Sequence, residues 1–143
     1  MTKEILAVSA ALLFTTLAHG QSYPRNPVTA NVPFAFQAGD TKMPAGEYHI
    51  QRAAQGSTTM EEVRAVGSSA NALLPVSLEN SKGSNDKSKL IFHCYRAECF
   101  LAEIRSEGGQ TLQIMESRRE KNLSQAKSEN QLAVVSVPLS AKP

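Results

Sequence analysis

The residues of this 143-residue chain that are best suited to chemistry lie together in one short segment. Residues 92–101 read FHCYRAECFL and hold the only two cysteines, Cys94 and Cys99, with His93 beside the first of them. Such residues serve in metal sites, in thiol redox couples and in structural disulfides. The choice among the three depends on the elements that position the sulfurs and on the compartment of the protein.

A metal site and a redox couple both fit the spacing poorly. Structural zinc normally has four ligands, and outside the first 20 residues the chain offers two cysteines and two histidines, His49 and His93. Neighbouring residues of a strand point to opposite faces, so His93 and Cys94 cannot easily hold one ion. A thioredoxin-like couple uses C-x-x-C before a helix, whereas this spacing is C-x4-C. We therefore expect no bound metal and no other cofactor.

A β-hairpin over the same segment predicts a structural disulfide. With Arg96 and Ala97 as a two-residue turn, Cys94 lies opposite Cys99, at a Cα separation of about 4.5 to 5.5 Å that a disulfide accepts. Arg-Ala is not the Asn-Gly type of turn that this loop prefers. A four-residue loop, which also keeps the sulfurs close, is therefore the alternative.

The beginning of the chain has the composition of a secretory signal peptide over residues 1–20. Lys3 precedes an apolar run over residues 5–18, and small residues follow. Cleavage is expected before Gln21, or alternatively after Ala18. The mature protein is then secreted or periplasmic, in an oxidising space where nearby thiols pair. No later segment approaches the length of a transmembrane helix, so no stable membrane insertion is expected.

The remaining residues 21–143 suffice for a single β-rich domain with its own core and are too few for two domains. Fifteen Lys and Arg nearly balance 13 Asp and Glu. The charges are scattered, and no basic stripe with interleaved aromatic residues is present. Nucleic acid is therefore not expected as a partner.

Apolar alternation predicts a mainly β fold, an antiparallel small β-barrel or sandwich of about seven strands with one C-terminal surface helix. Residues 57–66 are ambiguous between strand and helix, and strand is preferred. Pro33 indicates an edge position or a bulge in the first strand. The predicted strands cover residues 28–37, 47–52, 57–66, 71–78, 89–95, 98–105, 111–115 and 132–139.

The helix is expected from about residue 116 to residue 129, because this segment is rich in good helix formers and contains no Gly or Pro. Its apolar side is thin, so the helix should lie on the surface of the sheet. Met115, Leu123 and Ala126 are its expected inward positions.

Several short motifs are spread over residues 21–143: N-V-P-F-A-F at residues 31–36, A-G-D at 38–40, M-P-A-G-E-Y at 43–48, K-L-I-F-H-C-Y at 89–95, F-L-A-E-I at 100–104 and S-R-R-E at 117–120. In their order and spacing they resemble a family of small secreted proteins of unknown function that is abundant in acidobacteria. Similar proteins have Gly-Asp in place of Arg96-Ala97, and they typically lack the cysteine pair. The resemblance implies an exported protein in which the pair is a local addition to the hairpin, and it implies no catalytic residues.

Nothing in the sequence indicates an enzyme: a Gly-rich phosphate loop, a Ser-centred elbow and H-E-x-x-H are all missing. We expect an exported noncatalytic protein that binds a small apolar ligand or a protein partner of the envelope. The alternative is a secreted hydrolase that uses His93, Glu98 and Glu103. Strand parity places His93 and Glu103 on opposite faces, which counts against it. The expected core or pocket residues are Phe34, Phe36, Tyr48, Ile50, Ile91, His93 and Phe100.

Overall fold

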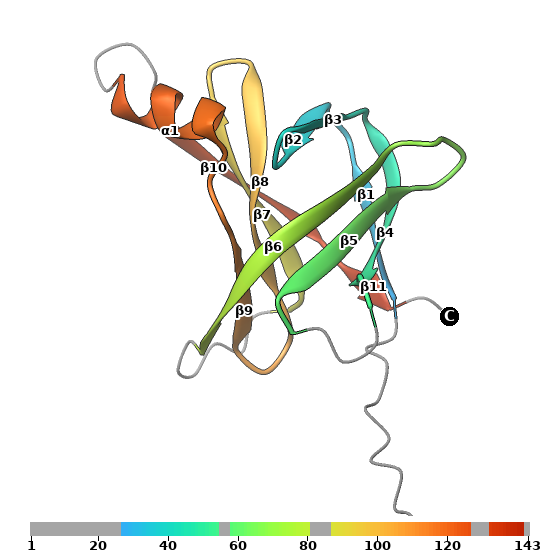
Figure 1. The fold of residues 1–143 in the computed structure, drawn as a ribbon. Coiled ribbons are helices and arrows are strands. Elements are labelled where there is room, and N and C mark those ends of the chain that lie inside the picture. Colours follow the sequence, from blue (N-terminus) through green and yellow to red (C-terminus); the bar gives the residue numbers. More distant parts are fainter. Residues whose placement is uncertain (1–26, 55–57, 81–86, 127–131, 142–143) are drawn as a thin grey trace, which may run out of the picture.

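Apolar alternation along the chain produces strands, and the computed structural model arranges them as a closed antiparallel β-barrel with one short helix (Figure 1). The structure describes residues 27–54, 58–80, 87–126 and 132–141, so the predicted leader and its cleavage site lie outside the described residues. The wall strands are β1 (Val28–Val32), β4 (Gly46–Arg52), β5 (Met60–Ala65), β6 (Asn71–Asn80), β7 (Lys89–Tyr95), β8 (Glu98–Arg105), β9 (Gln110–Ile114) and β10 (Leu132–Pro138).

The wall strands follow the order β10-β7-β8-β9-β6-β5-β4-β1. Strand β10 pairs with β7 at one edge of the sheet. The chain then continues as the short strand β11 (Ser140–Ala141), which pairs with β1 at the other edge and so closes the barrel. At this junction the Leu139 N–H still donates to the Ser88 carbonyl, at 2.9 Å. The predicted β fold is confirmed as a barrel, and the ambiguous segment 57–66 contains a strand, β5.

The predicted first strand is divided at Pro33. Proline has no N–H to donate, and β1 ends at the residue before it. The chain then forms an additional hairpin of β2 (Phe36–Ala38) and β3 (Thr41–Met43), with Gly39 in the turn at φ 58°. Figure 1 shows this hairpin at the upper end of the barrel. Two short strands, β3 and β11, lie outside the predicted strand segments and add to the predicted barrel.

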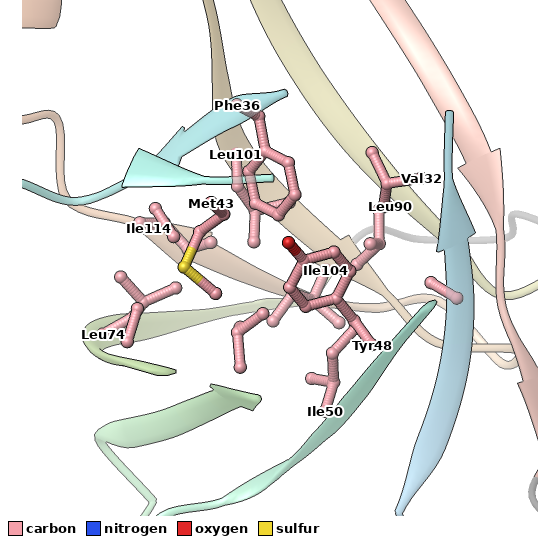
Figure 2. Close-up of a cluster of buried hydrophobic side chains, with 14 of the residues drawn as sticks. Val32, Phe36, Met43, Tyr48, Ile50, Leu74, Leu90, Leu101, Ile104 and Ile114 are labelled. Carbon is pink, nitrogen blue, oxygen red and sulfur yellow. The ribbon is translucent and has the colours of Figure 1, made fainter. Parts of the chain in front are cut away.

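The barrel interior is a packed core rather than a channel. Tyr48 and Phe92 are fully buried, and the Phe36 ring lies edge-on to both, with centroids 5.2 and 5.1 Å away. The Tyr48 hydroxyl donates a hydrogen bond to the Pro44 carbonyl. Figure 2 shows side chains from opposite walls meeting in this core. Burying a side chain of this size contributes about 1.5 to 3 kcal/mol, so the core supplies much of the driving force for closure.

The helix α1 (Arg118–Gln125) is shorter than predicted, and residues 127–129 of the predicted helix lie outside the described residues. Ser117 is its N-cap, and the Ser117 hydroxyl accepts from the Glu120 N–H at 3.2 Å. The predicted inward positions are largely wrong, because Met115 and Ala126 are exposed and Leu123 is half-buried. Glu120 is the buried residue instead. No helix of the described part of the chain is long and apolar enough to cross a membrane.

Candidate functional site

Cys94 and Cys99 form a disulfide across the β7–β8 hairpin, with their Cα atoms 4.0 Å apart. The two cysteines are direct partners in the ladder, and Arg96 and Ala97 form a two-residue turn. The predicted register is confirmed, and the four-residue loop is wrong. Arg96 has a φ of 55°, a conformation that favours Asn or Gly. Disulfides persist in oxidising compartments, so this bond is a mark of such a compartment.

Four of the predicted core or pocket residues lie inside the barrel. Phe36, Tyr48 and Ile50 belong to the central core, and Phe34 packs against it with its ring centroid 5.0 Å from that of Phe92. Phe36, Tyr48 and Ile50 occupy inward positions of β2 and β4, and Phe34 lies in the segment between β1 and β2. The aromatic side chains fill the middle of the barrel, which confines any cavity to its ends.

The other three predicted residues, Ile91, His93 and Phe100, lie on the outer face of β7 and β8. Ile91 and Phe100 are buried and His93 is half-buried, but none of them belongs to the cluster that fills the barrel. Phe100 packs against Tyr95, with ring centroids 6.1 Å apart. The inward side chains of β7 are the alternate ones, Leu90, Phe92 and Cys94.

Polar contacts connect this outer face to α1. Glu120 is only 3% exposed, and its Oε1 lies 3.4 Å from His93 Nδ1. Burial raises the pKa of Glu120, and the Glu116 charge raises it further, whereas His93 acts in the opposite direction. On the same side of the barrel, the Arg119 guanidinium donates two hydrogen bonds to the Glu98 carboxylate. These contacts of Glu120 and Arg119 join the helix to the β7–β8 hairpin.

The three residues of the hydrolase alternative are bound to separate partners. His93 contacts Glu120, Glu98 accepts from Arg119, and Glu103 accepts from Arg105 Nε at 2.7 Å. A bulge between Ile91 and Phe92 shifts the register and brings Glu103 to the outer face, so the predicted opposite orientation of His93 and Glu103 is wrong. Within the described ranges, no group of three or more His, Cys, Asp or Glu could hold a metal ion.

A cavity of about 200 Å³ opens into the barrel at the end that carries the β8–β9 turn, to which Ser106 and Glu107 belong. This turn lies at the lower end of the barrel in Figure 1. We call this cavity the lower-end cavity. Aliphatic side chains supply most of its wall, and two carboxylates and two hydroxyls supply the polar groups. Its lining residues are Val28, Ile50, Glu61, Ser88, Ile104, Ser106, Glu107 and Leu139.

Glu61 is the functional candidate that the sequence analysis missed. It lies on the same face of β5 as the core residues Val63 and Ala65, and it is 3% exposed. Its register partner on β6 is Leu74, another core residue. The sequence contained the information that places Glu61 in the interior. If residues 60–65 alternate with period two, one of the two adjacent glutamates must point into the barrel. The ambiguity of that segment between helix and strand concealed it.

A second cavity, the hairpin cavity, has a volume of about 230 Å³ and lies at the opposite end, between the β2–β3 hairpin and the β7–β8 turn. It is the more open of the two, and its charged groups are Lys42 and Glu98. Both cavities are smaller than the roughly 300 to 1,000 Å³ of drug-sized ligand sites. The lower-end cavity is the stronger candidate because it is better enclosed and its lining includes the buried carboxyl group of Glu61.

Comparison of the chain with protein-family models, with curated proteins and with solved structures finds no match. The class that the fold itself defines is a small closed antiparallel β-barrel with a disulfide-linked hairpin and a cavity at each end.

Proposed function

We propose that this protein is an exported, noncatalytic binding protein whose lower-end cavity takes a small, mainly apolar ligand. The observation that carries the proposal is the enclosure itself. Ile50 and Ile104 are 2% exposed, belong to the barrel core, and also line the cavity. A ligand that enters therefore meets a preformed aliphatic surface, and its affinity comes from the apolar area that it buries.

Export is supported by the disulfide together with the leader-like residues 1–20. The noncatalytic assignment is supported by the separate pairing of the candidate acid and base residues. We expect the secreted protein to begin at Gln21, or at His19, and to contain no free thiol. Intact mass measurement with and without alkylation tests both points, and a protein that retains Met1 and two free thiols inside the cell would contradict export.

Binding can be tested with toluene and 2-phenylethanol as neutral probes, by ligand-detected NMR and calorimetry. Leu139→Phe extends a half-buried lining residue into the lower-end cavity and should abolish binding. Ala97→Phe extends an exposed residue into the hairpin cavity and serves as the matched control, with no expected effect. Failure of both probes to bind, or loss of binding in the Ala97 variant alone, contradicts the proposed site.

A protein partner is the second candidate function, and exposed apolar residues favour it. Leu132 and Val134 of β10 are 51% and 62% exposed on the outer face of the barrel. Substitution of both by Ser leaves the lower-end cavity unchanged. If copurified protein is lost with this double variant while neither neutral probe binds the wild type, the partner function replaces the ligand function.

A further inference from the structure

The lower-end cavity contains an element that a site for a purely apolar ligand does not need, the inward carboxylate of Glu61. Its strand parity directs it into the barrel, and four of the other seven lining residues are aliphatic. The second carboxylate of the lining, Glu107, is exposed. One buried and one exposed acid thus lie along the same cavity.

From this arrangement we infer that the ligand is a small amphiphilic amine. Its ammonium group binds the Glu61 carboxylate, and its short hydrocarbon body lies against Ile50 and Ile104. This inference rests on the proposed function and names the chemical class of its ligand.

The charged groups of the cavity lining favour a cationic ligand over an anionic one. The described lining residues include two acids and two serines, and none of them is Lys, Arg or His. An anionic ligand would bring a like charge next to Glu61, which is unfavourable in an enclosed site. An ammonium group donates charge-assisted hydrogen bonds to a carboxylate, and these are stronger than neutral hydrogen bonds.

Groups of the protein itself compete with a ligand for the Glu61 carboxylate. Arg52 is the register partner of Glu61 on β4, and Glu61 already has an interaction within the protein. Binding of an amine is therefore an exchange of partners, which limits the gain in affinity. Arg52 is not among the described residues that line the cavity.

The serine hydroxyls can complete the coordination of the ammonium group. The Ser88 Oγ accepts from the Glu107 N–H at 2.9 Å, which fixes the hydroxyl at the edge of the cavity and leaves it a second lone pair. The cavity volume of about 200 Å³ limits the body to a short alkyl chain or one aromatic ring. Long-chain lipids are excluded by the same limit.

The test compares three probes with one phenyl body: 2-phenylethylamine, 2-phenylethanol and 3-phenylpropionate. Hydrogen bonds to charged groups are worth about 1.5 to 3 kcal/mol, so the amine should bind the wild-type protein about tenfold to a hundredfold more tightly than the alcohol. The carboxylate should bind most weakly. Calorimetry at pH 7 and moderate salt gives the three affinities on the unmodified protein.

The variant Glu61→Gln should reduce the affinity for the amine to that for the alcohol, and should leave the alcohol unchanged. Glu47→Gln is the matched control, since Glu47 is an exposed glutamate of β4, and it should change neither affinity. If Glu61→Gln does not fold, NMR contacts from the amine methylenes to the Ile50 and Ile104 methyl groups of the wild type decide the position of the ligand.

The outcomes separate the inference from the function on which it rests. If no probe binds, the proposed function fails. If the alcohol binds in the lower-end cavity and the amine binds no more tightly, or if Glu61→Gln weakens both probes equally, the function stands and the amine inference is overturned.

Discussion

Removal of the hairpin disulfide should lower stability by an amount that the size of its loop determines. The bond joins residues five positions apart, so the crosslink closes a loop of residues 94–99. The chain-entropy relation for a loop of this size gives about 2 kcal/mol at 25 °C. We therefore expect reduction of the wild-type protein to lower the free energy of unfolding by about 2 kcal/mol.

The double variant Cys94→Ala/Cys99→Ala separates the crosslink from the packing of the sulfurs. Cys94 is 6% exposed and belongs to the core, so its truncation adds a packing loss of about 1 kcal/mol to the loss of the crosslink. Urea unfolding followed by circular dichroism, with and without reductant, measures each quantity. Reductant should have no effect on the double variant, which is the control. A wild-type protein whose stability changes by less than about 0.5 kcal/mol on reduction would refute the entropic reasoning.

Three further substitutions test other parts of the structure by urea unfolding. Arg96→Asn should raise the free energy of unfolding by about 1 kcal/mol because it relieves the positive φ of the turn, and a loss of stability would contradict this. Hydrogen bonds from Gln51 and Arg64 lower the pKa of Glu62, so Glu62→Gln should cost about 1 to 2 kcal/mol at pH 7, with the difference vanishing as the pH falls below about 4. A cost independent of pH would disprove the ionic contribution. Burial raises the pKa of Glu120, so ionisation of this carboxyl group disfavours the folded state. The wild type should therefore lose stability relative to Glu120→Gln as the pH rises above about 4 through the raised pKa. A gain of stability over the same pH range would contradict the raised pKa.

The hairpin was predictable in detail because its determinants are local. Once Arg96 and Ala97 are taken as the turn, alternation fixes every pair up to Phe92 and Leu101, and the structure has these pairs. That register places the two cysteines directly opposite each other, where the structure has a disulfide. Local sequence is sufficient wherever the turn and the first pairs decide the geometry.

The features that the sequence did not reveal depend on distant partners. The bulge beyond Phe92 changes the parity of Glu103, and nothing in residues 98–105 marks its position. The buried Glu120 contacts His93, a residue from another element, whereas helical periodicity considers only apolar residues. The cavity around Glu61 is formed by strands that meet only after the barrel has closed.

The way in which the barrel closes determines when it can form. Of the described strands, β1 comes first in the chain and its second neighbour, β11, comes last, with Val28 opposite Ala141. The contacts that complete the wall are thus among the most distant in sequence, and such contacts make folding slow. While the polypeptide is being made, the sheet remains open, with unpaired edges that attract other chains. The final ten described residues therefore decide whether the newly made molecule becomes a stable barrel or stays open to aggregation.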